Sequence, residues 1–314
     1  MSWEHAIVWC LWTAVFLTAG IYVTAVLDGV IARAVSRRPI QAGAALARPV
    51  QAAALLLLQR PTRTERPDAA LWLLAPALLA TVAAGIVAAI PVGSAAAAPA
   101  IDAGIVYVGA LMALVMVAVF VHGWAANSLF PLVGGYRFVA LALSYEMPLA
   151  LVLIAAALPA QSLAIDAMVR SQAGLWNVVR QPLGLPLYLV ASLGLAFRGP
   201  LDVPDAADLA GGTEVERTGV DRLLWRAARD AILVAVAALG AAAFLGGWMG
   251  PWLPGPVWLA FKTLALVAVL LLVSHFLGRV RLERFVVVAW VVLIPLALVD
   301  VFAAGVVALL GARG

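Results

Sequence analysis

The ionisable residue of most interest is Glu146, which lies in the run Ser144-Tyr145-Glu146-Met147-Pro148 inside a long apolar stretch. Ionisable groups in apolar spans are rare, and they usually face a bundle interior or a water-filled path where they handle protons. Pro148 loosens the helix beside the carboxylate. A structural ion pair with Arg137 is the alternative, although a separation of nine residues places the two on different helical faces. A few other charged residues also lie within predicted apolar spans: Arg229, Asp230, Lys262 and Asp300.

A second group of chemically useful residues is an acidic run that follows Arg198. Glycine and proline turn formers are interleaved with its acids, which indicates a folded and partly enclosed loop lining an aqueous cavity. A freely solvated loop is the alternative, because most charge runs are solvated. Five acids fall within fifteen residues: Asp202, Asp205, Asp208, Glu214 and Glu216.

Motifs of soluble enzymes are not found in the sequence. It has no glycine-rich phosphate loop, no paired-cysteine metal site and no nucleophile elbow. The three histidines, His5, His122 and His275, are far apart, so we expect helix-end or packing roles and no metal site. The nineteen arginines lie next to apolar stretches, which indicates membrane topology and not nucleic-acid binding.

These residues must be positioned by membrane helices. Of 314 residues, 65% are hydrophobic and only 11% are charged, whereas soluble domains carry about 25% charged residues. We therefore predict an all-α fold, a polytopic transmembrane helix bundle that forms a single membrane domain over 1–314. The fifth span is short and contains Pro186, so it must pack among other helices. About eight spans of the required length are expected, at 5–27, 70–92, 103–123, 131–158, 182–197, 228–249, 256–277 and 284–309.

The arginines also predict the orientation. Fourteen lie in 28–69, 198–227 and 278–284, which share one side of an eight-span bundle, and three lie on the other side, at Arg170, Arg180 and Arg313. The positive-inside rule makes the arginine-rich side cytoplasmic, with both termini on the other side. The apolar stretch 40–60 is expected to be an amphipathic helix within the 28–69 loop, because counting it as a ninth span would destroy this bias.

A set of short motifs resembles the family of the H subunit (subunit 1) of respiratory complex I. That family includes the related membrane subunits of energy-converting nickel–iron hydrogenases and formate hydrogenlyase. Each motif is weak alone, but the order and spacing of the set are specific. The motifs are Gly123-Trp-Ala-Ala-Asn-Ser128, Arg137, Ser144 to Leu149, Gln181-Pro-Leu-Gly184, Arg198 to Asp205, Glu216 to Gly219, Gly246 to Pro251, Trp258 with Lys262, Arg279-Val-Arg281, and Trp290 with Ile294 to Leu298.

The resemblance implies a subunit of a proton-translocating NADH:quinone oxidoreductase in the inner (plasma) membrane, not catalytic by itself. It places Glu146 in a proton axis and the five acids of the 198–227 loop in the coupling of redox chemistry to that axis, with Arg198 positioning the loop near the quinone cavity. The implied partners are antiporter-like and small helical membrane subunits and a peripheral iron–sulfur subunit. The chain is expected to bind no cofactor by itself, and whether quinone sits at the interface with peripheral subunits is left open.

Several positions depart from the family pattern. A family glutamate before the loop is replaced by Leu195, and another in the sixth span is replaced by Arg229. The family's Glu-Arg-Lys run is Leu27-Asp28-Gly29, and the tyrosine after Glu216 is Arg217. Three alternatives therefore stay open: a membrane subunit of a hydrogenase or formate hydrogenlyase complex, a structural anchor without proton conduction, and, from a different class, a stand-alone transporter or channel.

Overall fold

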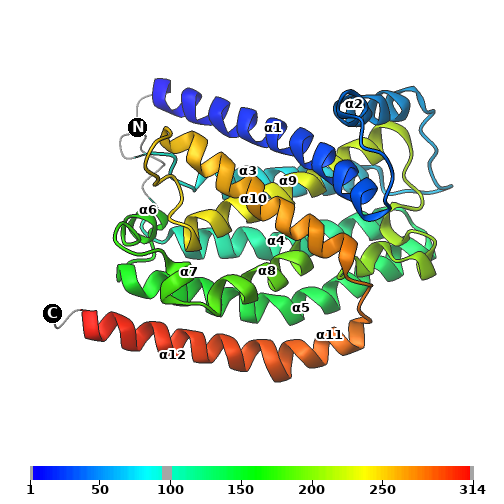
Figure 1. Cartoon of the computed structure of the whole chain (residues 1–314). Coiled ribbons are helices and arrows are strands. Elements are labelled where there is room, and N and C mark those ends of the chain that lie inside the picture. The colour runs from blue at the N-terminus through cyan, green and yellow to red at the C-terminus, as the bar shows by residue number, and fades with distance from the viewer. Residues whose placement is uncertain (1–2, 94–100, 312–314) are drawn as a thin grey trace.

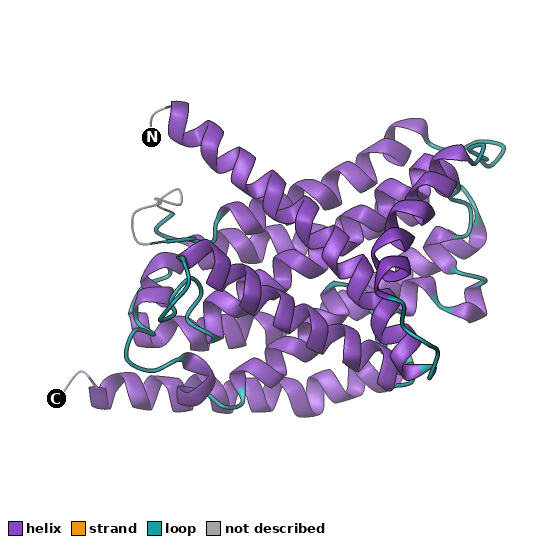
Figure 2. Ribbon diagram, turned by 45° about the horizontal axis from the view of Figure 1, so that its top comes forward, coloured by secondary structure: helices purple, strands orange, loops and turns teal. Residues whose placement is uncertain are grey.

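The computed structural model describes residues 3–93 and 101–311, and within these ranges the chain forms helices and loops without a strand (Figure 2). Seven of the helical segments are long and apolar enough to cross a membrane, which makes the chain a multi-pass membrane protein. They are α1 (Trp3–Val35), α3 (Ala69–Ala88), α4 (Gly104–Ala125), α5 (Leu129–Ala157), α9 (Gly219–Phe244), α10 (Gly255–Phe276), and a final segment made of α11 (Leu282–Val288), the π-helical turn η5 (Ala289–Leu293) and α12 (Ile294–Gly311).

The predicted span at 182–197 differs from the other seven. It forms α8, which runs only from Gly184 to Leu195, or 12 residues. At 1.5 Å per residue this helix is about 18 Å long, short of the roughly 30 Å of a hydrocarbon core. Before it come the short elements η1 (Leu158–Ala160), α6 (Ile165–Arg170) and α7 (Asn177–Arg180).

Although α8 is short, it forms the eighth crossing of the chain between the two ends of the bundle. It packs against α5, α7, α9 and α12 inside the bundle. A Cβ at Gly194 would lie 2.6 Å from the Tyr145 ring, so the glycine is what allows α8 to approach α5 this closely. Because of this crossing, α1 begins and α12 ends at the same end of the bundle (Figure 1).

The centre of the bundle is α9, which contacts α1, α3, α8 and α10. Its second half is rich in alanine and is almost completely buried. Small side chains let membrane helices approach closely, which is how helices associate where lipid is as apolar as the side chains. At Gly20 of α1, for example, a Cβ would lie 2.7 Å from a methyl group of Val234.

One end of the bundle, at the right of Figure 1, carries the predicted arginine-rich regions and is called here the loop-bearing end. Two predicted boundaries need correction there. The loop expected from residue 28 begins only after Val35, because α1 is longer than its apolar core. The loop expected over 198–227 ends at Gly219, where α9 begins. The 196–218 loop contains three short 3-10 turns, η2 (Val203–Asp205), η3 (Ala207–Leu209) and η4 (Gly212–Glu214).

The expected amphipathic helix is α2 (Ala42–Leu58), which contacts α1 and α9 and has no fully buried residue. Leu55 and Leu58 are exposed on it, as suits a helix lying at a membrane interface.

At the opposite end, three neutral amide side chains join the ends of α5 and α9 to the 165–183 segment. The Asn177 amide donates to the carbonyls of Ala156, at 3.1 Å, and Ala243, at 2.9 Å. Two glutamine amides donate in the same way. Gln181 donates to the Ala155 carbonyl at 2.7 Å, and Gln172 donates to the Ala242 carbonyl at 2.8 Å. These amides bond to carbonyls in the last turns of α5 and α9, where intrahelical partners run out.

The Lys262 ammonium group has a related role. It donates to three carbonyls just after α9, those of Leu245 (2.6 Å), Gly247 (3.0 Å) and Met249 (2.6 Å). It also lies 4.4 Å from the centre of the Trp176 ring. All three N–H donors are therefore used in holding the turn between α9 and α10.

Candidate functional site

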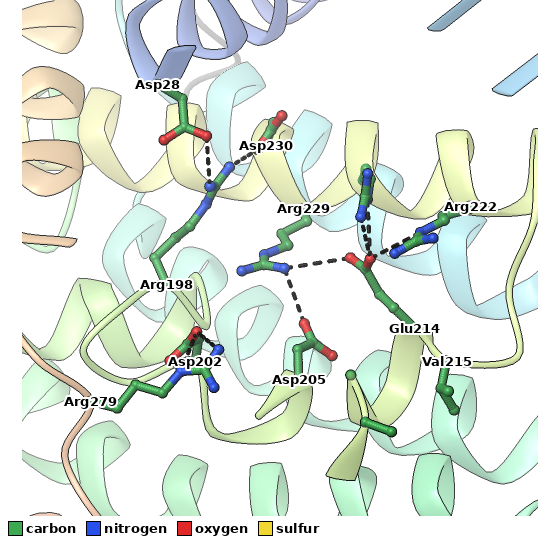
Figure 3. A pocket seen from close by; sticks show the side chains of 13 residues that line it. Asp28, Arg198, Asp202, Asp205, Glu214, Val215, Arg222, Arg229, Asp230 and Arg279 are labelled. Atoms are coloured by element: carbon green, nitrogen blue, oxygen red, sulfur yellow. Dashed lines mark hydrogen bonds and ion pairs between the residues drawn. The ribbon is translucent and has the colours of Figure 1, made fainter. Parts of the chain in front are cut away.

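A cavity of about 620 Å³ opens at the loop-bearing end, between the 196–218 loop, the end of α1, the first turns of α9 and the turn after α10. Figure 3 shows that its charged side chains point toward one another across the cavity. Acids and arginines are equal in number: Asp28, Asp202, Asp205, Glu214 and Asp230 face Arg198, Arg222, Arg226, Arg229 and Arg279. The predicted folded loop lining a polar cavity is therefore what the structure contains.

Glu214 lies at the centre of an arginine cluster. Its carboxylate is 3.0 Å from Arg226, 3.3 Å from Arg222 and 3.5 Å from Arg229, and only 8% of its side chain is exposed. Burial acts to raise the pKa of Glu214, but the guanidinium groups, with Arg229 the strongest, outweigh burial and hold that pKa below its ordinary value. The carboxylate is therefore an anion held in place from three sides.

Asp205 is in a different state although it shares Arg229 with Glu214. Its carboxylate accepts hydrogen bonds from Arg229, at 3.0 Å, and from the Thr213 hydroxyl. Burial outweighs both partners and raises the pKa of Asp205 to about 6. Arg229 also donates to the Phe197 carbonyl at 2.8 Å. One guanidinium on α9 thus contacts the beginning, the middle and the later part of the loop.

Arg198, the predicted positioning residue, joins the start of the loop to two helices. Its guanidinium contacts Asp230 of α9 and lies 3.5 Å from Asp28 of α1. Burial acts to lower the pKa of Arg198, but Asp230 and Asp28 outweigh it and raise that pKa. Arg198 is therefore a fixed cation.

Two more loop acids pair with arginines near the edge of the cavity. Asp202 accepts bidentate hydrogen bonds of 2.6–2.9 Å from Arg279, and both residues also line an adjoining cavity of about 640 Å³. Asp208 lines only that second cavity, where it is exposed and 2.7 Å from Arg137. The hydrogen bond from Arg137 lowers the pKa of Asp208. Arg137 thus has a loop partner, and Glu146 is not its partner.

The last loop acid, Glu216, points elsewhere. Its carboxylate accepts a hydrogen bond from the Ser128 hydroxyl at 2.9 Å, and it is not part of the wall of either cavity. The next residue, Arg217, is buried over the Trp72 ring at 3.5 Å and donates to the Trp72 carbonyl. Burial lowers the pKa of Arg217 to about 10. These contacts attach the end of the loop to α3 and to the start of α5, where Ser128 is the N-cap residue.

Glu146 lies within α5, half-buried and away from the cavity wall. One of its carboxylate oxygens is buried without a hydrogen-bond partner in the protein. Pro148 does not interrupt α5, which continues to Ala157. The neighbouring Tyr145 packs on Gly194 of α8, four residues before the loop begins at Arg198. Glu146 is therefore next in sequence to the residue through which α5 packs on α8, the helix that leads into the loop. It does not lie among the loop acids.

Sequence reasoning did not identify the partners of the loop acids. Arg222, Arg226 and Arg229 follow one another at helical spacing on the first turns of α9, and this pattern beside an acidic run was an available signal. Asp28 and His275 gave no such signal, because they come together from helices that are far apart in the sequence. Among the described residues, no group of three or more His, Cys, Asp or Glu side chains is placed to hold a metal ion.

Comparison with known proteins gives consistent matches along most of the chain. A family model described as NADH dehydrogenase matches residues 7–305. An H subunit of NADH-quinone oxidoreductase from Rhodopseudomonas palustris, the one numbered 2, is 35% identical over 251 residues, covering 78% of this chain and 79% of the relative. The H subunit from Geobacillus thermodenitrificans is 34% identical over 258 residues, covering 80% of this chain and 77% of the relative. The H subunit numbered 1 from Geobacter metallireducens is 32% identical over 260 residues, covering 80% and 79%.

Proposed function

The chain belongs to the NADH dehydrogenase family of H subunits, as a membrane subunit of a complex I-like NADH:quinone oxidoreductase, and we propose that it couples redox chemistry in peripheral subunits to proton transfer in the membrane. In this proposal the 196–218 loop receives the redox signal and Glu146 handles the proton. The chain performs no redox step itself, and quinone is a substrate of the assembled complex.

The observation that carries the proposal is the position of Arg229. This one residue of a central membrane helix contacts two buried loop acids, Asp205 at 3.0 Å and Glu214 at 3.5 Å. A change of charge or position in the loop therefore changes the forces on α9 directly. Electrostatic forces act strongly here because the partners are largely removed from water.

A second route leads from the loop to Glu146. The loop starts where α8 ends, and α8 contacts α5 through Gly194 and Tyr145. Any displacement at Arg198 is passed along a rigid helix to the residue next to Glu146. The unpartnered carboxylate oxygen of Glu146 supports a role in proton handling, because a purely structural acid would have its oxygens bonded.

The proposal includes an orientation and partners. The arginine-rich loop-bearing end faces the cytoplasm, and the ends of α1 and α12 face the other side. Peripheral subunits then contact the 196–218 loop, and further membrane subunits contact the apolar outer faces of the helices. Accessibility of tags fused to the two termini in intact cells tests this orientation.

The names of the relatives support the complex I role over a hydrogenase-type complex. The structural-anchor alternative has one specific observation in its favour. Leu195 is fully buried, and Arg229 has its carboxylate partners within the loop, so neither position offers a titratable acid to a proton path.

The test is Glu146→Gln in the intact complex, reconstituted in vesicles. We expect the complex to assemble and to lose proton translocation by at least about tenfold, because the amide cannot carry the proton. Asp166→Asn, at an exposed ion pair with Arg170 on the opposite end, is the matched control and should change nothing. Translocation that survives unchanged in Glu146→Gln would support the anchor instead.

A further inference from the structure

Beside the cavity of about 620 Å³, which Asp28 lines, lies a histidine–carboxylate pair that the proposed function does not use. His275, at the end of α10, has its Nε2 atom 2.8 Å from Oδ1 of Asp28, at the end of α1. The two side chains are 29% and 35% exposed, so water reaches both. Imidazole exchanges protons near neutral pH, and a hydrogen-bonded carboxylate orients the ring and stabilises its charged form.

The other oxygen of Asp28 belongs to the group that holds the start of the loop. Arg198 lies between Asp28, at 3.5 Å, and Asp230 (Figure 3). Two carboxylates and one guanidinium have a net charge of −1, and one proton on His275 or Asp28 makes the four-residue group neutral. This group is therefore the negative part of a cavity whose five acids and five arginines balance as a whole, and a proton added here neutralises that part.

The other charged groups of the cavity, three acids and four arginines, carry the compensating positive charge. On α9, Arg229 faces Asp205 and Glu214, and it acts on Asp230 only at longer range. Asp202 and Arg279, in the loop and after α10, neutralise each other. Among the described residues that line this cavity, the excess negative charge thus lies at Asp28 and Asp230, beside His275.

We propose that His275 and Asp28 form a proton-accepting dyad that controls how tightly Arg198 holds the start of the 196–218 loop. A proton from solution binds the His275 imidazole, and the imidazolium donates its Nε2–H to Oδ1 of Asp28. The proton stays on the ring, because a carboxylate is much less basic than an imidazole. The new cation competes with Arg198 for Asp28, so the hold of Asp28 on Arg198 weakens and Asp230 holds Arg198 more nearly alone.

The backbone beside Arg198 makes this change relevant to the loop. A Cβ at Gly199 would lie 3.0 Å from the Ser274 carbonyl, so the chain after Arg198 rests directly on the last turn of α10, next to His275. A weaker hold on Arg198 therefore loosens the contact between the loop and α10. This inference rests on the proposed coupling role of the loop and adds the place at which protons from water act on it.

The first test measures proton binding and not activity. Hydrogen–deuterium exchange at the imidazole C2 position, followed by mass spectrometry of the purified complex, gives the titration curve of His275. In Asp28→Asn the midpoint should move to lower pH, because the anionic partner at 2.8 Å is gone. Asp28→Glu should keep the midpoint near that of the unchanged protein, and Asp166→Asn is the control. A midpoint that does not respond to Asp28→Asn would overturn the dyad.

The second test follows the loop in the same samples. Backbone amide exchange of residues 199–203, divided by the intrinsic exchange rate at each pH, should contain a component with the same midpoint as His275, besides the transition of Asp205. This component should disappear in His275→Gln. The comparison of midpoints can be made on the unchanged complex, so it does not depend on any variant assembling. Midpoints that differ would refute the link between dyad and loop. Neither readout uses proton translocation, so failure here is distinct from failure of the Glu146→Gln test.

Discussion

The two ends of the bundle are held together by different chemistry. At the loop-bearing end, charged side chains contact one another around a cavity of about 620 Å³. At the opposite end, three neutral amides and Lys262 donate to backbone carbonyls at the ends of α5 and α9. The ion pair of Asp166 and Arg170 at that end is exposed and lies outside this set of bonds.

This difference separates a fixed part of the molecule from a responsive one. Bonds from amides to carbonyls do not change with protonation near neutral pH, so they hold the ends of α5 and α9 under all working conditions. Contacts between carboxylates and arginines change whenever a proton is gained or lost. A loop that moves against a fixed helix bundle needs both kinds of end.

The largest effect is expected at the fixed end. Lys262→Met removes three hydrogen bonds and leaves the carbonyls after α9 without their donor, at a cost of about 4 kcal/mol in the free energy of unfolding. Thermal unfolding of the purified protein in detergent, followed by circular dichroism, measures the loss. Arg170→Met, on an exposed residue at the same end, should lie close to the unchanged protein. An equal unfolding temperature for Lys262→Met would show that this end is not fixed by the lysine.

A smaller but still large effect is expected from Arg229→Gln at the responsive end. The change leaves Asp205 and Glu214 buried with less positive charge, and breaking such a pair costs about 3 kcal/mol. The loss should appear locally, as faster amide exchange over 197–218, with little change in the exchange of the 165–183 segment at the opposite end. Faster exchange in that segment to the same degree would mean that the two ends are not independent.

The smallest effect is expected from Asp205→Asn, and its sign follows from the pKa. The pKa of Asp205 is raised to about 6, so the closed loop binds a proton more firmly than an open loop, in which the carboxyl has its ordinary pKa near 4. Loop closure by this group is therefore strongest at low pH and weakens as the pH rises through this window.

Asparagine resembles the protonated form of Asp205. In Asp205→Asn, amide exchange of the loop at pH 7 should be slower by about tenfold, and the difference should vanish at about pH 4. Asp208→Asn is the matched control, because Asp208 is exposed and its pKa is lowered by Arg137. If Asp205→Asn speeds exchange at pH 7, the attraction of Arg229 outweighs the burial of Asp205, contrary to the raised pKa.

Most of the fold could be predicted because hydropathy alone marks long helices in a membrane. The seven long helices lie within about five residues of the predicted spans, with two exceptions. The helix α1 ends eight residues late, at Val35, and α9 begins nine residues early, at Gly219. The fifth span was predicted to be short, and α8 is shorter still; its exact ends, Gly184 and Leu195, could not be predicted in this way. Its ends depend on bonds from Asn177 and Gln181 to carbonyls of other helices, and such tertiary contacts leave no trace in local apolar composition.

The candidate site was predictable for its acids and not for their partners. Acids interleaved with glycine and proline indicated a folded loop. Three of the five, Asp202, Asp205 and Glu214, line the cavity of about 620 Å³. The exposed position of Asp208 and the separate direction of Glu216 depend on Arg137 and Ser128, which belong to another part of the chain. The role of Glu146 in proton transfer stays a prediction, as do the roles of the loop acids.

The shortness of α8 also determines how the protein can be made. A 12-residue apolar stretch is too short to enter a bilayer as an independent span during synthesis. Its polar lead-in segment is satisfied in part by carbonyls of α9, which is synthesised after it. Insertion of α8 therefore has to wait for later parts of the chain, and the 196–218 loop takes its final shape only when that late step is complete.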